Sequence, residues 1–406
     1  MEYRDINEWI DSRLSTKSIW YVKRLSGNDT LANGAHQAGP YIPRNVIFDA
    51  IPSLAKSISP NPDQRLQAFI DSHDYKSEVR AIWYNSATRN EARITKWGGA
   101  TSPLLSPEAT GALTIFTFLR QGDTPELRIW ICRSVSEEDA AQELFGVVEP
   151  GRGAIEWRPF ELPGAFPPIA KINRSRCWLK PDEMPRDWLA RFPSPAELIE
   201  KVISLRTTLN LTPDQRLIER RECEFELFRS IEHAIETPII MAGFSGIEDF
   251  LLPAQRILQR RKARAGRSLE LHARQLLIEE GFQEGVTFSF QPESDPGKTP
   301  DFLFPSEAAY KNPTFPKECL HLLAAKTTCR DRWRQVISEG DRISEKHLLT
   351  LQEGISETQF EEMTSAGVRL VVPEPLHTKY STAIRPKLLT LRSFMDQVRN
   401  ARHRAR

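Results

Sequence analysis

The chain has 406 residues, of which 40% are hydrophobic and 27% charged, and its 55 Lys and Arg against 54 Asp and Glu give a formal net charge of +1. This length predicts two or three domains, each large enough for a hydrophobic core. The charge balance excludes a polycation that coats nucleic acid through bulk charge, and equally an acidic disordered tail protein. Any binding to nucleic acid must therefore come from local groups of residues.

The same composition predicts a soluble cytoplasmic protein that does not contact a membrane. No apolar run approaches the roughly 18 residues of a membrane span, and the first residues, MEYRD, do not resemble a signal peptide. The five cysteines are odd in number and contain no CxxC pair. We therefore expect reduced and mostly buried thiols rather than a disulfide framework or a zinc site.

The chain up to about residue 160 is predicted to be a mainly β domain, built as a small barrel. Residues 113–119 and 127–132 are alternating runs of β-branched and aromatic residues, and Gly, Pro, Asn and Asp lie between such runs. Residues 161–185 are rich in proline, which stops helices and central strands and predicts a linker. We place the first domain at 1–162, the linker at 163–185 and the second domain at 186–406.

Beyond the linker, helix-start sequences appear. Ser194-Pro195-Ala196-Glu197 is a capping box that opens a helix of about a dozen residues. Thr212-Pro213-Asp214-Gln215 opens a longer helix through about His233, and a third helix begins near Ser268 and ends at Gly281. Strand-like runs at 287–290, 301–304, 320–326, 347–351 and 368–372 follow, with helical segments at 333–342 and 388–399. The alternation predicts an α/β domain with a mixed central sheet.

Charge is distributed unevenly along this second part. Residues 254–274 contain seven basic side chains and one acid, whereas residues 351–365 contain four acids and no base. Such a basic run is usually a solvated helix face, but its position directly before the candidate catalytic residues gives a phosphate-binding surface equal weight.

One pair of residues suggests a reaction. Asp301 opens a strand and Lys326 ends the next one, so the two can meet at one edge of a sheet. A carboxylate that binds Mg²⁺ and an ammonium that orients water suit phosphodiester hydrolysis, although a turn aspartate and a surface lysine would look the same. Nucleases usually carry a second acid two residues before the lysine, where this chain has Ala324. Glu339, on the expected helix 333–342, is the natural replacement, unless it is simply a solvated helix residue.

Longer segments resemble a known family. Residues 262–270, Pro300-Asp301-Phe302-Leu303-Phe304-Pro305, residues 326–335 and Glu339 closely resemble the EcoRII family of restriction endonucleases, which are homodimeric, Mg²⁺-dependent enzymes with a PD-(D/E)xK-type core. The resemblance implies that Asp301 and Glu339 hold the metal and that Lys326 is the catalytic lysine. It implies that Glu270 is a further acid of the site, and that Arg264 and Tyr310 lie at positions implicated in activity.

The resemblance also implies which residues read DNA. Arg330 and Arg332 would each contact a guanine through two hydrogen bonds and Asp331 a cytosine, unless the triplet is a surface ion-paired group. Arg221 and Phe225, four residues apart on one helix face, would hold a flipped A or T base, unless they are a core phenylalanine and an exposed arginine.

The N-terminal residues 21–30, 34–37, 80–86 and 89–98 resemble the effector domain of that family, a DNA-binding barrel similar to plant B3 domains. That domain contacts DNA through two arms. The resemblance places Lys23, Arg24 and His36 in or near the first arm, and Arg80, Arg89, Glu91 and Arg93 on or beside the second. Ala87 stands where the family has a lysine, which predicts one missing contact. A charged hairpin is the other interpretation of these residues.

Taken together, the resemblance implies a Type IIE restriction endonuclease. Such an enzyme cuts both strands of double-stranded DNA at a CCWGG-like site, W being A or T, ahead of the first cytosine. Its N-terminal domain blocks the catalytic cleft until it binds a second target copy, and a companion cytosine methyltransferase protects the host. The alternatives are a sequence-specific DNA-binding regulator with an inactive nuclease core and a structure-specific repair nuclease. A regulator would bind without cutting, and a repair nuclease would cut branches regardless of sequence.

Overall fold

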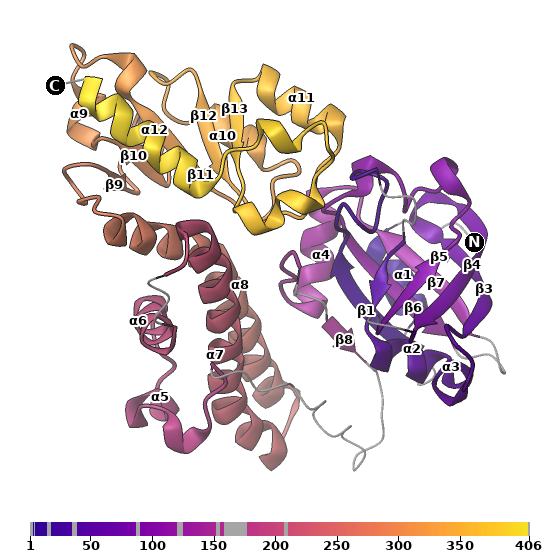
Figure 1. The fold of residues 1–406 in the computed structure, drawn as a ribbon. Coiled ribbons are helices and arrows are strands. Elements are labelled where there is room, and N and C mark those ends of the chain that lie inside the picture. Colours follow the sequence, from indigo (N-terminus) through magenta and orange to yellow (C-terminus); the bar gives the residue numbers. More distant parts are fainter. Residues whose placement is uncertain are drawn as a thin grey trace.

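The computed structural model describes residues 3, 5–13, 18–34, 39–86, 90–119, 125–151, 155–157, 177–206 and 210–404. They form a barrel-like N-terminal domain that lies beside a C-terminal domain made of long helices and a five-stranded sheet (Figure 1). Within these residues, no helix is long and apolar enough to cross a membrane. The first part of the expected linker, residues 163–176, lies outside the described residues.

The N-terminal domain is built on eight strands in the order β2-β5-β4-β3-β7-β6-β1-β8, which curve into a nearly closed barrel. Neighbouring strands are antiparallel, apart from the parallel pair β3 and β7. The mainly β domain and the strands at 113–119 and 127–132 are therefore confirmed. The strands are β1 Ser18–Arg24, β2 Tyr41–Ile42, β3 Asp63–Ile70, β4 Tyr75–Tyr84, β5 Glu91–Thr95, β6 Leu113–Leu119, β7 Glu126–Ile131 and β8 Ile155–Trp157.

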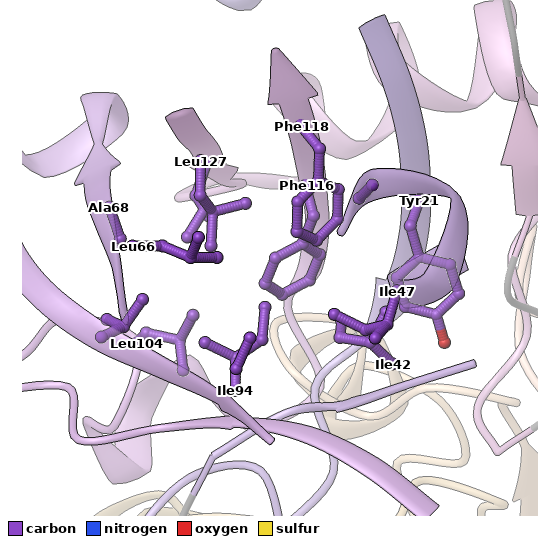
Figure 2. Packing of buried hydrophobic residues seen from close by; sticks show 14 of the residues in the cluster. Tyr21, Ile42, Ile47, Leu66, Ala68, Ile94, Leu104, Phe116, Phe118 and Leu127 are labelled. Carbon is purple, nitrogen blue, oxygen red and sulfur yellow. The ribbon is translucent and has the colours of Figure 1, made fainter. Parts of the chain in front are cut away.

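Within its described residues, four α-helices accompany the barrel, none of which the sequence patterns predicted: α1 Ile6–Arg13, α2 Arg44–Ala50, α3 Pro52–Lys56 and α4 Val135–Phe145. Side chains that alternate along β3, such as Leu66 and Ala68, point into the barrel and pack with Phe116 and Phe118 of β6 (Figure 2). The outer face of β6 is buried too, because α1 and α4 pack a second cluster around Trp9 on that side. Burial on both faces explains why β6 is an almost continuous apolar run.

The C-terminal domain opens with a helical layer. Its helices are α5 Arg186–Ala190, α6 Pro195–Leu205, α7 Pro213–Ala242 and α8 Ile247–Glu279. Both expected capping boxes form, at Ser194 and at Thr212, so the starts of α6 and α7 are confirmed. α7 runs nine residues past His233, and α8 begins at Ile247 rather than near Ser268, so these two predicted bounds are wrong.

α7 and α8 lie side by side as a long hairpin that projects away from the five-stranded sheet (Figure 1). Each contains a proline, Pro238 and Pro253, which removes one helical hydrogen bond and normally favours a break. Packing of one helix along the other overrides this local preference. Gly281, whose φ is +85°, follows the end of α8 as expected.

The five-stranded sheet has the order β13-β12-β11-β10-β9. β11, β12 and β13 are parallel, whereas β10 is antiparallel to both of its neighbours, which confirms the mixed sheet. α11 was not predicted, because its segment reads only as an acidic run. The elements are β9 Ser289–Phe290, β10 Phe302–Phe304, α9 Glu307–Lys311, β11 His321–Ala325, α10 Trp333–Ile337, β12 Lys346–Leu349, α11 Glu357–Ser365, β13 Val368–Val371 and α12 Leu391–Arg404.

Each face of this sheet is covered by its own hydrophobic cluster. Leu322 and Leu348 belong to the cluster that includes Trp333 of α10 and Phe360 of α11. Leu323 and Leu349, their chain neighbours, belong to the other, which α8 and α12 cover. The side chains thus alternate between faces along the strands, and the functional site lies at the strand ends between the two layers.

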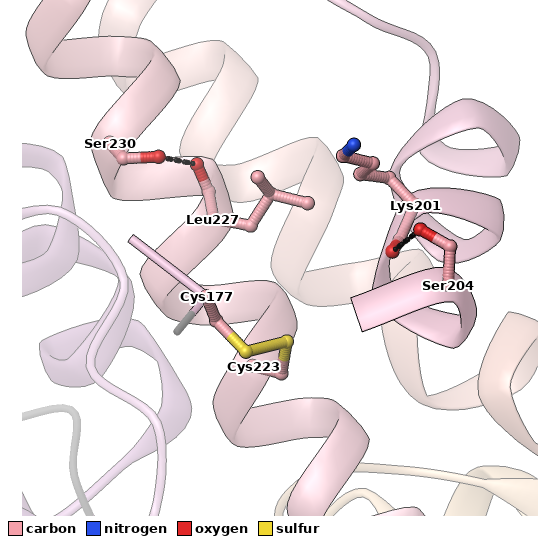
Figure 3. The surroundings of a disulfide bond; sticks show 6 residues. All are labelled: Cys177, Lys201, Ser204, Cys223, Leu227 and Ser230. Carbon is pink, nitrogen blue, oxygen red and sulfur yellow. Dashed lines mark hydrogen bonds between the residues drawn. A yellow bond between two sulfur atoms is a disulfide. The ribbon is translucent and has the colours of Figure 1, made fainter. Parts of the chain in front are cut away.

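One expectation about cysteine is wrong. Cys177 and Cys223 form a disulfide, with sulfur atoms 2.11 Å apart, that joins the second half of the expected linker to α7 (Figure 3). Cysteines 46 residues apart carry no spacing pattern that would predict the pair. Cys132, Cys319 and Cys329 are free and buried, as expected.

Candidate active site and domain interface

The site begins where β10 and β11 lie side by side. Asp301 directly precedes β10 and Lys326 directly follows β11, and because the strands are antiparallel neighbours the two residues meet. One carboxylate oxygen of Asp301 accepts hydrogen bonds from the backbone N–H of Ala325 at 2.7 Å and from the ammonium of Lys326 at 3.2 Å. The structure thus brings the predicted carboxylate and lysine into direct contact.

Glu339 approaches the same place from a turn. α10 ends at Ile337, so the expected helix 333–342 is too long, and Gly340, in the left-handed region at φ +62°, continues the turn. The pKa of Glu339 is raised to about 7, mainly by burial, while Lys326 lowers it and Asp301 adds to the rise. Its Oε2 atom is buried and has no hydrogen-bond partner among the described residues. A buried, incompletely bonded carboxyl beside Asp301 is an unusual arrangement for a purely structural residue.

Glu270 reaches the site from α8. The side-chain amide of Gln291 donates to its carboxylate at 2.8 Å. The pKa of Glu270 is raised to about 7, mainly by burial and also by the charge of Asp301, while Lys326 opposes both effects. Ala324, at the usual position of the second acid, is fully buried inside β11. The additional acids therefore come from α8 and from the turn after α10.

The acids suit a divalent cation through their oxygen chemistry. Within the described residues no group of three or more His, Cys, Asp or Glu side chains is arranged to hold an ion. Besides burial, the charge of Asp301 raises the pKa of both Glu270 and Glu339, so negative charge at the site is poorly compensated. Carboxylate oxygens are the ligands that Mg²⁺ prefers, and a bound cation would reverse these pKa shifts. Asp301 and Glu339, with its unpartnered oxygen, fit this role.

The triplet Arg330-Asp331-Arg332 lies between β11 and α10. The guanidinium of Arg330 donates to Glu138 at 2.6 Å and to the backbone oxygen of Cys132 at 3.3 Å, both in the N-terminal domain. Asp331 forms an ion pair with Arg334 at 3.1 Å, as the surface interpretation expects. Arg332 lines a cavity between the domains. In this arrangement the guanidinium of Arg330 is bound by acceptors of the N-terminal domain.

Arg221 and Phe225 both lie on α7, as expected. Arg221 is buried and donates to Glu224 at 3.2 Å and to Glu149 of the N-terminal domain at 2.7 Å, so the expectation of an exposed arginine is wrong. Arg264 of α8 places its guanidinium 5.3 Å from the ring centre of Phe225 and donates to the same Glu149 at 2.5 Å. Arg221 and Arg264 thus share one glutamate of the N-terminal domain, and Arg264 also lies over the ring of Phe225.

Tyr310 lies on α9, in a hydrophobic cluster of the sheet. Its hydroxyl donates to Asp295 at 2.9 Å and accepts from the backbone N–H of Arg342 at 3.3 Å, and burial raises its pKa to about 12. These contacts tie Tyr310 to the framework around the site, and its role in activity stays a prediction.

The residues expected in the first effector arm differ from one another. Lys23 forms an ion pair with Asp29 at 2.7 Å. Arg24 is buried: its guanidinium donates to the backbone oxygens of Val148 at 2.8 Å and Gly111 at 3.0 Å, and to Glu138 at 2.7 Å. In this conformation Arg24 is a structural arginine of the domain interface. His36 lies outside the described residues.

The second arm maps to the neighbouring strands β4 and β5. Arg80 pairs with Asp63 at 2.8 Å, and Arg93 pairs with Glu91 at 3.1 Å and donates to the backbone oxygen of Gly39 at 3.2 Å. The strand register places Arg80 opposite position 95, so these side chains share one face. Arg89 and Ala87 lie outside the described residues.

The basic run on α8 is largely neutralised. Glu232 and Glu236 of α7 and Glu149 of the N-terminal domain take up most of its arginines, so the run is neither a freely solvated face nor an open phosphate-binding surface. Lys262 lines the cavity between the domains, and Arg267 donates to Gln291 at 3.3 Å. The ion pairs of the run are Arg256–Glu236 at 3.2 Å, Arg260–Glu236 at 2.8 Å, Arg261–Glu232 at 2.6 Å, Arg264–Glu149 at 2.5 Å and Arg274–Glu284 at 2.5 Å.

Two glutamates that join the domains were missed in the sequence. Glu138 on α4 accepts hydrogen bonds from Arg24 at 2.7 Å and from Arg330 at 2.6 Å. Burial alone would raise the pKa of Glu138, but these two guanidinium groups hold it below its ordinary value. Glu149 binds both Arg221 and Arg264. Single glutamates without a motif cannot be recognised in a sequence as partners of arginines some 70 to 190 positions away.

Between the domains lies a cavity of about 780 Å³. Its walls include Glu270, Lys326 and Arg332 from the C-terminal domain and Gln142 and Glu149 from the N-terminal domain.

Comparison with known proteins gives a consistent result for both domains. A family model described as restriction endonuclease EcoRII, N-terminal, matches residues 15–160. A second, described as EcoRII C terminal, matches residues 228–395. Together the two models cover more than half of the chain.

Individual relatives agree with the family models. The chain is 42% identical over 386 residues to the Type II restriction enzyme EcoRII of Escherichia coli, covering 93% of each chain. It is 28% identical over 220 residues to the Type II restriction enzyme SsoII of Shigella sonnei, covering 50% of this chain and 68% of the relative.

Two solved structures show lower similarity. One is metal-depleted Ecl18kI in complex with uncleaved, modified DNA, with a TM-score of 0.44 and 20% identity over 54% of this chain and 82% of that chain. The other is the UbaLAI restriction endonuclease B3 domain with cognate DNA, with a TM-score of 0.28 and 20% identity over 38% of this chain and 98% of that domain.

Proposed function

Because the chain belongs to the EcoRII family of Type II restriction enzymes, which are site-specific deoxyribonucleases, we propose that it makes a Mg²⁺-dependent double-strand cut at a CCWGG-like site. The cut falls ahead of the first cytosine, W is A or T, and a companion cytosine methyltransferase protects host DNA in the bacterial cytoplasm. The family generally uses a divalent metal, and Mg²⁺ is our proposal for this chain.

The cluster of Asp301, Lys326, Glu339 and Glu270 carries this proposal. Bound Mg²⁺ would polarise the scissile phosphate and lower the pKa of the attacking water. Lys326, whose ammonium lies 3.2 Å from Asp301, fixes that carboxylate and presents positive charge to the phosphate. Without a cation, Glu270 and Glu339 both have a pKa of about 7, and a bound cation would lower both values, so the two carboxylates would be charged in the loaded site.

For recognition, we propose that Arg330-Asp331-Arg332 reads the G·C pairs. Two guanidinium groups that each bind one guanine and a carboxylate that accepts from cytosine discriminate by about 1–3 kcal/mol per base pair. Arg221 and Arg264, beside the ring of Phe225, provide a cation and a stacking surface for a flipped central base. A fluorescent 2-aminopurine at the W position should brighten on binding if the base leaves the stack.

We further propose that the N-terminal domain restrains the enzyme until it binds a second target copy. Glu138 and Glu149 occupy three arginines, Arg330, Arg221 and Arg264, to which we assign DNA contacts. Each of these arginines donates to a glutamate carboxylate where it would otherwise donate to an acceptor on DNA. DNA must therefore displace the N-terminal domain to reach the arginines. Arg24 links this contact to the effector barrel, because it shares Glu138 with Arg330.

Cutting both strands requires two active sites, and each chain has one, so we propose a homodimer. The tip of the α7–α8 hairpin, residues 238–252, provides a surface for the second copy. It carries seven of the fourteen large apolar side chains that are exposed among the described residues, including Phe250 and Leu252. Glu248 and Arg256 lie four residues on either side of Leu252, so antiparallel copies would pair opposite charges. Sedimentation of Leu252→Glu, which should shift toward monomer, checks this surface.

The proposed function is tested with plasmids that carry one or two CCWGG sites, in the presence of Mg²⁺. Wild type should linearise the two-site plasmid quickly and the one-site plasmid slowly, and Lys326→Ala should leave both intact. Equal nicking by both proteins would contradict the assignment of Lys326. Specific binding without any cutting by the wild type would instead favour the regulator with an inactive core.

A further inference from the structure

Gln352 is a buried residue just after β12 whose polar atoms are all engaged. Its side-chain oxygen accepts from the backbone N–H of Cys329 at 2.9 Å and of Arg330 at 3.4 Å, and its side-chain nitrogen donates to the backbone oxygen of Gly354 at 3.0 Å. Its backbone oxygen accepts from the hydroxyl of Tyr380 at 2.7 Å. Gln352 is 1% exposed, so burial and these hydrogen bonds together hold its side chain in one position.

A second glutamine holds the other side of the same residue. Gln359, in the first turn of α11, donates from its side chain to the backbone oxygen of Arg330 at 2.9 Å. Gln359 also helps to cap α11, because its backbone N–H donates to Ser356 at 3.1 Å. The N–H and the C=O of Arg330 are thus each bound by a glutamine amide, from two different elements.

The geometry points to a function for this arrangement, which rests on the DNA-reading role proposed above for Arg330. We propose that Gln352 and Gln359 are positioning residues for sequence specificity: they fix the backbone from which Arg330 reaches a guanine. They need not touch DNA themselves.

Physical chemistry explains why a read-out arginine needs such support. Two-point contact with guanine requires the planar guanidinium to meet both acceptors at once, and a site of this kind tolerates errors of only about 0.5 Å and 10–20°. Arg330 lies in a segment between β11 and α10 that has no regular secondary structure to fix its backbone. The buried side-chain amide of Gln352 and the half-buried one of Gln359 supply the hydrogen bonds that a helix or strand would otherwise provide to this backbone.

The N-terminal domain also lies against Gln352 and its neighbour Glu353. A β-carbon added to Gly111, whose φ is +84°, would lie 2.8 Å from the side-chain amide of Gln352. The backbone N–H of Gly27 donates to the oxygen of Glu353 at 2.5 Å. The domain that occupies the guanidinium of Arg330 through Glu138 therefore also contacts the residue that fixes its backbone.

The test compares discrimination with overall activity. Gln352→Met keeps the size of the side chain and removes both the acceptor and the donor, whereas Gln352→Glu keeps an acceptor for the two N–H groups. We measure the ratio of two cleavage rates with the full-length protein. One substrate is a CCWGG duplex, and the other is the same duplex with its outer G·C pair changed to A·T. Thermal unfolding is measured in parallel. Gln359→Met repeats the test at the second amide, and Gln397→Met, on α12, is the matched control.

We expect Gln352→Met to lower the preference for CCWGG by about 10-fold or more, through faster cutting of the altered duplex relative to the cognate one. Gln352→Glu should retain more of the preference than Gln352→Met, and Gln397→Met should behave like wild type. If discrimination stays at the wild-type level while cleavage and thermal stability fall together, both amides are only structural and the inference is wrong. Equal loss of preference in Gln352→Met and Gln352→Glu also overturns it.

Failure of the proposed function gives a different result. A wild-type protein that does not distinguish the two duplexes contradicts the DNA-reading role of Arg330 itself. A wild type that discriminates, beside a Gln352→Met variant that discriminates equally, contradicts only the positioning role.

Discussion

Glu339 contributes to the site through a carboxyl group that folding leaves incompletely bonded. Its buried Oε2 has no hydrogen-bond partner among the described residues, and burial raises its pKa to about 7. This environment supports the proposal that Glu339 is a metal ligand, because coordination would compensate both the missing bond and the negative charge.

Glu339→Gln is the residue-scale test, because the amide has the same shape without the charge. We expect the Mg²⁺-dependent cleavage rate at saturating DNA to fall by at least about 100-fold, with DNA binding retained. Glu345→Gln, at an exposed carboxylate six residues further on, should cleave like wild type. Equal rates for Glu339→Gln and wild type would remove Glu339 from the metal site.

Residue chemistry was predictable from the sequence where a motif fixes it. Asp301 and Lys326 end adjacent strands, and their 3.2 Å contact follows from strand order alone. Glu138, Glu149 and Gln352 could not be predicted, because their partners come from distant segments and the residue types themselves are common. For such residues only the folded structure shows what a carboxylate or amide binds.

At the scale of elements, β12 and α12 meet through a buried histidine. His347 lies 4.9 Å from the ring of Phe394 and 5.9 Å from that of His321. The pKa of His347 is lowered to about 3, mainly by burial and also by the neighbouring His321 and Arg369. The folded state therefore keeps this side chain neutral at pH values where an unfolded chain would protonate it.

The sign of the effect on stability follows directly. Between pH 6.5, the ordinary value for histidine, and about pH 3, the unfolded state binds a proton that the folded state does not, so stability falls as the pH falls. At pH 5 the cost is about 2 kcal/mol. Between pH 7 and pH 5 we expect the unfolding free energy of the wild type to fall by about 2 kcal/mol more than that of His347→Leu, as measured by urea unfolding. An unchanged pH dependence would contradict the buried neutral histidine.

Elements were predictable to the extent that local chemistry determines them. The capping boxes at Ser194 and Thr212 fixed the starts of α6 and α7. The hairpin tip was not predictable, since Pro238, Gly243 and Pro253 all favour a break and only the packing of α7 on α8 extends the helices. The helix around Trp333 was overestimated because the chain turns at Gly340 to bring Glu339 to the site.

At the scale of the whole molecule, the net charge of +1 results from cancellation between segments and within the domain interface. Glutamates of α7 and of the N-terminal domain neutralise the arginines of α8, so little basic surface is left for nonspecific DNA. Because nonspecific affinity grows with the number of phosphates neutralised, this arrangement favours selective binding. The domain order was predictable from the family resemblance, whereas this ion-pair network was not.

Restraint by the N-terminal domain predicts a gain of activity. Replacing both Glu138 and Glu149 by Gln removes the charged partners of Arg330, Arg221 and Arg264, so the domain should leave the cleft more readily. We expect cleavage of a one-site plasmid to rise by about 10-fold toward the two-site rate. Glu143→Gln, an exposed cavity residue, is the control. A one-site rate that stays at the wild-type level would show that these glutamates do not restrain the enzyme.

The central claim is that this protein cuts both strands of DNA at one defined sequence. Sequencing the ends of a plasmid library cut by the wild-type protein with Mg²⁺ tests it most directly. The account predicts that ends from both strands map ahead of the first cytosine of CCWGG-like sites, and that Lys326→Ala yields none of them. Ends scattered without a common sequence, or the same ends produced by Lys326→Ala, would contradict it.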